Sequence, residues 1–183
     1  MAKVKIAKPS IITLEFHQEK QDEDYGSCMW ARFVIDTKNY ELHICSDCGN
    51  YGYSWVPTSE HESFLRLLFR MDRDYFLDKI GYLDVIDVED TYNKIKAYLE
   101  YLVEGETLEE AGIDIDSLYT ACTYGNKQEI HESICSVIRN SNVLGAEGFE
   151  IYECVSLTYS YNQKKIAEIF TEYIQPFIKE NLL

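Results

Sequence analysis

Apolar and polar residues alternate with a period of two over the first third of the chain, which is the pattern of strands with one buried face. Polar turns separate the last three of these rows and predict tight connections between strands. The alternating rows cover residues 12–16, 29–35, 40–44 and 51–55, and the turns lie at residues 36–39 and 46–50. The pattern predicts a four-stranded antiparallel meander that ends at Pro57.

Apolar residues in the middle of the chain recur every three or four positions, which is the period of an amphipathic helix. Ser59 with Glu62, and Thr107 with Glu110, have the spacing of capping boxes, which open helices. The expected helices cover residues 59–71, 72–80, 88–104, short segments between 107 and 125, and 130–140. We expect the apolar faces of the first two helices, residues 59–71 and 72–80, to cover one side of the sheet.

The period of two returns from Phe149 to Tyr161 and predicts a further strand. Asn162 is the expected N-cap of a final helix, whose broad apolar stripe is bent or restarted at Pro176. We therefore expect a single α+β domain over residues 1–183. Its antiparallel sheet would consist of the N-terminal four-stranded meander plus the late strand, packed with helices.

Composition excludes several classes of protein. The 183 residues are 46% hydrophobic and 14% aromatic, enough for a normal core, so a disordered chain is not expected. The apolar runs are short, so we expect no transmembrane helix and no membrane partner. The start, Met1–Ser10, is basic and lacks the apolar stretch of a secretory signal. We therefore expect a cytoplasmic protein whose six cysteines stay reduced.

Charge is the most informative feature of the composition, because the chain has 32 acidic residues but only 17 Lys and Arg, which gives a formal net charge of −15. The segment Asp84–Asp116 holds 11 acidic residues and only two basic ones, Lys94 and Lys96. Such a field repels a phosphate backbone, so direct non-specific binding to nucleic acid is disfavoured. It attracts basic proteins instead. The alternative interpretation is a solvated acidic face that keeps the chain soluble.

We expect the acidic segment to bind a basic protein, such as a nucleic-acid-binding protein. The chain also has 15 tyrosines, which supply amphipathic contact area at binding surfaces, although many would equally line the sheet. The residues expected on this acidic face are Asp84, Asp87, Glu89, Asp90, Glu104, Glu106, Glu109, Glu110, Asp114 and Asp116.

Cys45 and Cys48 form a Cys-x-x-Cys pair in a predicted turn, with Cys28 and His43 near enough in sequence for a zinc site. A structural zinc site usually shows a second such pair, and this sequence has none. A redox-active pair needs a helix N-terminus, whereas this one lies between predicted strands. We therefore expect neither a metal nor another cofactor.

Asp36, His43, Asp47 and Glu60 form the alternative active-site cluster. Carboxylates and imidazoles at strand ends could hold a divalent cation for a metal-dependent ribonuclease. Ordinary turn and cap roles explain the same residues, and the sequence has neither a phosphate-binding glycine loop nor a His-Glu-x-x-His motif. We assign no catalytic residue and favour a binding protein over an enzyme.

Four stretches in the first 80 residues carry a resemblance to a known family. They read YGSCMWARF, SDCGNY, ESFLRLL and DYFLDKI, at Tyr25–Phe33, Ser46–Tyr51, Glu62–Leu68 and Asp74–Ile80. The chain resembles small proteins carried by phages and mobile elements of Gram-positive bacteria. Its size and acidity are also similar to those of anti-CRISPR proteins, which inhibit Cas9.

This resemblance implies an inhibitor that binds Cas9, alone or with its guide RNA, in the cytoplasm of a bacterial host. An acidic, Tyr-rich surface would block DNA binding or cleavage. Two alternatives stay open: a metal-dependent ribonuclease or trigger of guide-RNA cleavage, and a phage accessory protein that regulates another host enzyme. An exposed apolar stripe on the final helix would allow a homodimer.

Overall fold

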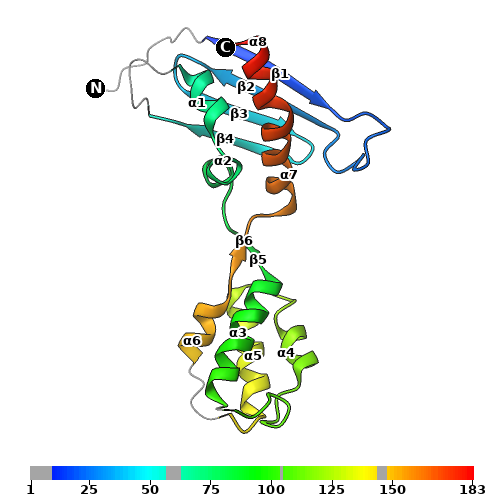
Figure 1. Cartoon of the computed structure of the whole chain (residues 1–183), viewed down its shortest axis with the longest axis vertical. Helices are drawn as coiled ribbons and strands as arrows, with labels where there is room; N and C mark the ends of the chain where they lie inside the picture. The colour runs from blue at the N-terminus through cyan, green and yellow to red at the C-terminus, as the bar shows by residue number, and fades with distance from the viewer. Residues whose placement is uncertain (1–9, 57–62, 104, 144–147) are drawn as a thin grey trace, which may run out of the picture. The chain divides into compact units, whose positions relative to one another are not determined.

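The computed structural model describes residues 10–56, 63–103, 105–143 and 148–183 (Figure 1). Its contacts divide the chain into two compact units. Unit 1 consists of Met1–Tyr82 together with Tyr159–Leu183, and unit 2 is Leu83–Thr158, inserted between them. The single domain expected from the sequence therefore contains two compact units, and whether they unfold as one domain stays a prediction.

Unit 1 contains the expected four-stranded antiparallel meander, in the order β1-β2-β3-β4. Leu14, Phe33, Ile44 and Tyr51 are paired in register across it and place apolar side chains on one face. The sequence prediction is confirmed here, because alternation marks a sheet with one buried face. The strands are β1 Ile11–His17, β2 Trp30–Asp36, β3 Glu41–Ser46 and β4 Gly49–Ser54.

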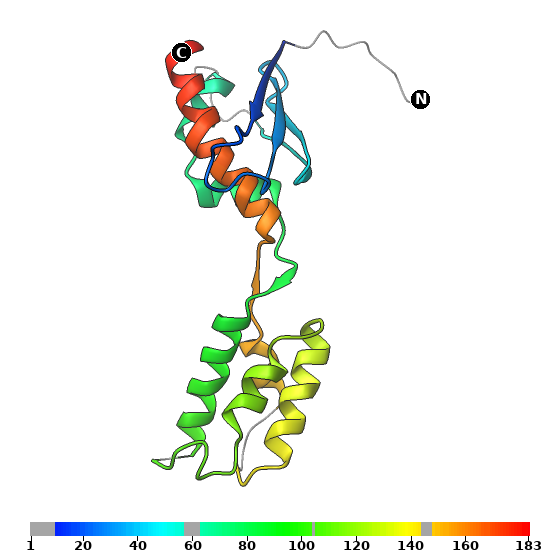
Figure 2. The same cartoon turned by 90° about the vertical axis from the view of Figure 1, so that its right-hand side faces the viewer.

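Helices from two distant parts of the sequence lie along the apolar face of this sheet (Figure 2). Phe170 joins them, because its ring stacks on Phe76 with 3.8 Å between centroids and lies 6.2 Å from Phe33 in the sheet. All three rings are fully buried. The helical segments are α1 Phe64–Arg70, α2 Arg73–Ile80, α7 Tyr161–Ile169, the π-helical turn η1 Phe170–Ile174 and α8 Gln175–Asn181.

The ends of these helices differ in part from the sequence prediction. The proposed Ser59–Glu62 capping box lies outside the described residues, and Ser63 caps α1. Ser160, not Asn162, caps α7, because Ser160 and Gln163 satisfy each other's backbone N–H groups in a complete capping box. In place of the break expected at Pro176, a π-helical turn ends at Ile174, two residues before the proline, which cannot donate an intrahelical hydrogen bond.

Unit 2 is a small helical unit with its own core. Ile95 and Leu99 of α3 meet Leu118 of α4 and Ile130 and Ile134 of α5, all of them fully buried. A two-stranded antiparallel pair joins the two ends of the unit, with Val85 opposite Thr158. Its elements are β5 Val85–Ile86, α3 Val88–Leu102, α4 Ile115–Ala121, α5 Lys127–Arg139, α6 Gly148–Cys154 and β6 Leu157–Thr158.

The long strand expected over Phe149–Tyr161 is wrong. Helix α6 occupies its first half, and only Leu157 and Thr158 form a strand, which pairs with β5 and not with the meander. Ile151 and Val155, both buried, are four residues apart, and a spacing of four fits a helix as well as a strand. The Thr107–Glu110 hydrogen bonds of the expected capping box do form, but turns follow them and not a helix.

No helix in the described part of the chain has the length and apolar character needed to cross a bilayer.

Both tryptophans, Trp30 and Trp55, lie in unit 1, so tryptophan fluorescence reports the unfolding of that unit alone. Because the two hydrophobic cores share no residue, we expect fluorescence and far-ultraviolet circular dichroism to give urea transitions that do not coincide. Coincident transitions of the full chain would instead support one cooperative domain.

Gln175 fastens α8 to the end of α1. Its buried side-chain amide donates to the carbonyls of Leu68 and Met71, each at 2.7 Å. Gln175→Leu would leave two buried carbonyls without these donors, so we expect a loss of about 2 kcal/mol in the free energy of unfolding, measured in urea. Gln128→Leu, at an exposed amide that bonds Glu132, is the control and should change stability by less than about 0.5 kcal/mol.

Candidate functional site: an acidic unit and a groove beside the sheet

Negative charge is concentrated in unit 2. Between Leu83 and Thr158, sixteen Asp and Glu stand against four Lys and Arg, a net charge of −12. The remainder of the chain has sixteen acidic and thirteen basic residues. Unit 2 therefore carries most of the −15, although it is less than half of the chain.

The acidic residues predicted from the sequence form two groups in unit 2. Asp84, Asp87, Glu89 and Asp90 lie at the beginning of α3, and the others follow its end. Helix α3 has 15 residues and is therefore about 22 Å long, which separates the two groups. Glu104 lies outside the described residues. The structure thus presents two acidic patches, where the sequence predicted one face.

The patch at the beginning of α3 combines structural and free carboxylates. Asp87 caps the helix by accepting the N–H of Asp90 at 3.0 Å, and Asp90 pairs with Lys94 at 2.7 Å. The hydrogen bond from Lys94 holds the pKa of Asp90 below its ordinary value. Asp84 and Glu89 are exposed and form no ion pair within the described residues. These two are free to meet a partner.

The patch after α3 borders a groove of about 430 Å³. Glu100, Glu106 and Glu109 line it, and the one ammonium group in its lining, Lys96, is 3.8 Å from Glu100. Three carboxylates against one ammonium make the groove a place for a Lys or Arg side chain.

Two further carboxylates of this patch have local structural roles. Glu110 accepts the backbone N–H of Thr107, and this bond lowers its pKa. Asp114 caps α4 by accepting from Asp116 N–H and the Ser117 hydroxyl. Replacing either would disturb local folding, whereas Glu106, Glu109 and Asp116 are exposed and cap no helix.

The tyrosines divide between surface and core. Tyr101 and Tyr124 of unit 2 are each 79% exposed, which suits contact with a partner. Tyr40, Tyr51 and Tyr159 pack against the core of unit 1, so part of the tyrosine excess lines the sheet.

The alternative active-site cluster is not assembled. Asp36 and Asp47 lie at opposite ends of β3, roughly 17 Å apart along the strand. His43 lies between them on the uncovered face of the sheet, 3.7 Å from Glu41, and Glu60 is outside the described residues. Burial raises the pKa of Asp36, but hydrogen bonds from Asn39 and Lys38 outweigh it and keep the pKa below its ordinary value. Asp36 is a turn residue.

The cysteines are grouped differently from the sequence prediction. Cys45 is exposed on a strand, while its predicted partner Cys48 is buried beside Cys28 and Asp47. Burial raises the pKa of both Cys28 and Cys48, so neither is a ready nucleophile. The spacing of residues 45 and 48 pointed to the wrong pair because Cys45 lies on the exposed face of β3, as His43 does, whereas Cys48 lies in the turn that follows the strand.

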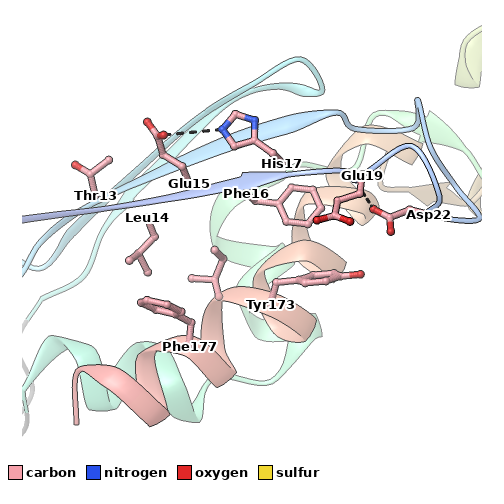
Figure 3. A pocket seen from close by; sticks show the side chains of 10 residues that line it. Thr13, Leu14, Glu15, Phe16, His17, Glu19, Asp22, Tyr173 and Phe177 are labelled. Carbon is pink, nitrogen blue, oxygen red and sulfur yellow. Dashed lines mark hydrogen bonds and ion pairs between the residues drawn. The ribbon is translucent and has the colours of Figure 1, made fainter.

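A groove that the sequence did not reveal lies between β1 and the C-terminal helix, and we call it the β1 groove (Figure 3). Its volume is about 590 Å³. Phe16 and Tyr173 meet across its floor with ring centroids 4.9 Å apart, and Tyr173 and Phe177 stay about half exposed. The lining residues are Thr13, Leu14, Glu15, Phe16, His17, Glu19, Asp22, Tyr173, Ile174 and Phe177.

Strand β1 is at the edge of the four-stranded sheet, so the groove borders backbone groups that no other described strand pairs with. Gln18 N–H donates to Met29, and Ser10 accepts from Thr37 N–H, so the even-numbered residues face β2. The N–H and C=O groups of residues 11, 13, 15 and 17 therefore point outward. Hydrophobic alternation identifies a strand but not its place in a sheet, which is why the sequence did not reveal this edge.

Comparison with curated proteins gave no match, and comparison with solved structures gave none either. A family model, Phage phiTE 072, which is described as a phage family, matches residues 5–180. The match spans both units and nearly the whole chain, so this protein belongs to that phage family.

Proposed function

We propose that this phage protein binds a basic, nucleic-acid-binding host protein through unit 2 and blocks its nucleic-acid site. Cas9 is the first partner to test, with or without its guide RNA, in the cytoplasm of the host cell. The observation that supports the proposal is the concentration of net charge, −12 within the 76 residues of Leu83–Thr158.

The mechanism would be competition with phosphate. A channel that holds DNA is lined with Lys and Arg, and exposed carboxylates on a folded scaffold can occupy it. Asp84 and Glu89 in one patch, and Glu106 and Glu109 in the other, are exposed and cap no helix. The two patches lie at opposite ends of α3 and are therefore about 22 Å apart. This distance is close to the length of six or seven nucleotide steps of a DNA strand.

Guide-RNA cleavage by this chain is the less favoured alternative. A metal-dependent ribonuclease needs carboxylates that converge on a cation, and Asp36 and Asp47 do not converge. The charge of unit 2 also opposes direct binding of RNA.

Neutralising the free carboxylates should remove binding. We expect the variant Asp84→Asn, Glu89→Gln, Glu106→Gln, Glu109→Gln to bind guide-loaded Cas9 at least about tenfold more weakly, because each exposed ion pair contributes up to about 1 kcal/mol. Biolayer interferometry over a panel of Cas9 orthologues, with DNA cleavage in parallel, measures the effect. Raising the salt concentration should weaken the wild-type complex.

The matched control removes the same charge from unit 1, with Glu23→Gln, Asp74→Asn, Glu172→Gln and Glu180→Gln, all at exposed positions. It should bind like the wild type. Equal losses in the two variants would mean that only net charge matters, and no binding to any orthologue would remove Cas9 as the partner. Shortened guide RNA on a denaturing gel would favour the ribonuclease alternative.

A second candidate function is the binding of an extended segment in the β1 groove. The outward backbone groups of β1 can pair with an added strand, as in β-strand addition. Apolar side chains would contact Tyr173 and Phe177, and basic ones Glu15, Glu19 and Asp22. This charge complementarity favours a segment in which apolar and basic residues alternate. It disfavours a second copy of β1, which would bring another Glu15 close to these carboxylates.

A labelled peptide of alternating Val and Lys residues tests this function by fluorescence anisotropy. Phe177→Ser should weaken binding several-fold because it removes a half-exposed apolar contact. Tyr101→Ser, at an exposed aromatic residue of unit 2, should leave binding unchanged. Residues 1–9 also mix Lys with apolar residues. If the peptide bound only after these residues were deleted, the result would contradict a role of the groove in binding a partner and would assign the groove to the start of the chain.

A further inference from the structure

Two separate connections of unit 1 bring three metal-binding side chains together. Cys28 belongs to the link between β1 and β2, and Asp47 and Cys48 form the turn between β3 and β4. The two sulfur atoms and a carboxylate oxygen all lie within 4.8 Å of one another. No other group of three or more such residues within this distance was found in the described part of the chain.

The distance between one of the sulfur atoms and the carboxylate oxygen fits a tetrahedral zinc ion. With Zn–S near 2.3 Å and Zn–O near 2.0 Å, a tetrahedral angle places sulfur and oxygen about 3.5 Å apart. Sγ of Cys28 is 3.4 Å from Oδ1 of Asp47. Thiolates are soft ligands, which bind zinc in preference to the harder cations magnesium and calcium.

The carboxylate is held in place by a neighbouring group. Oδ2 of Asp47 accepts the backbone N–H of Met29 at 2.9 Å, which turns Oδ1 toward Cys28. Outer hydrogen bonds of this kind orient the ligands in metal sites and raise affinity.

Burial gives the site a protected interior and one open side. Cys28 and Cys48 are 0% and 4% exposed, whereas Asp47 is exposed, so an ion can enter past the carboxylate. Cys45 of the Cys-x-x-Cys pair is exposed on β3 and takes no part in the cluster.

We propose that Cys28, Asp47 and Cys48 bind one zinc ion, with water at the fourth position. On binding, the two thiols lose their protons to solvent, and two thiolates with one carboxylate give the loaded site a net charge of −1. The ion ties the β1–β2 connection to the β3–β4 turn and so stabilises unit 1. This site is independent of the acidic patches of unit 2.

The test uses the full chain, purified in a reducing buffer without chelator, loaded with zinc and desalted. Elemental analysis should find one zinc per chain, and cobalt in its place should give the near-ultraviolet absorption of a cobalt–thiolate bond. Cys28→Ala and Cys48→Ala should each weaken zinc binding at least tenfold. Cys45→Ala is the matched control, which removes the other half of the Cys-x-x-Cys pair and should keep full binding.

Two readouts keep the proposal testable where a cysteine variant fails to fold. Asp47→Asn keeps an acceptor for the Met29 N–H but loses the charged ligand, so it should fold and bind zinc more weakly. Stripping zinc from the wild type with EDTA should lower the melting temperature followed by tryptophan fluorescence. A wild type that holds no zinc, or zinc binding lost in Cys45→Ala and kept in Cys28→Ala, would overturn the assignment.

Discussion

The packing of Phe170 is the interaction on which the fold of unit 1 depends. Its ring stacks on Phe76 of α2 and lies beside Phe33 of the sheet, so one side chain connects the meander, an early helix and the C-terminal helix. The meander has one apolar face, and a sheet of this kind is stable only when that face is covered. Part of the cover comes from residues after Tyr159, so unit 1 is complete only once the chain has passed through unit 2.

The separate core of unit 2 explains why this unit can carry so much charge. Its ends are held together by the pair of β5 and β6, and its own core of Ile and Leu side chains is separate from that of unit 1. Every residue in the hydrophobic core of unit 1 comes from unit 1, so that core need not accommodate the carboxylates of unit 2. Most of the net charge is thereby carried by a unit whose core is separate from that of the sheet unit.

The two grooves and the cysteine cluster show how topology brings functional groups together. Residues 28 and 48 are distant in sequence and adjacent in space, because the β1–β2 connection and the β3–β4 turn lie at the same end of the meander. The β1 groove exists because the C-terminal helix crosses beside an edge strand.

The sequence by itself determined the meander, the period of helices α2, α3 and α5, and the acidic character of residues 84–116, because each depends on local periodicity or on composition. It wrongly predicted a strand at residues 149–154, because the spacing of Ile151 and Val155 fits both periods. Only the tertiary structure decided that the acidic residues form two patches, that Cys48 lies beside Cys28 and not Cys45, and that β1 is the edge strand of the meander. These features depend on contacts between residues far apart in the chain, and local pattern carries no information about which distant segments will meet.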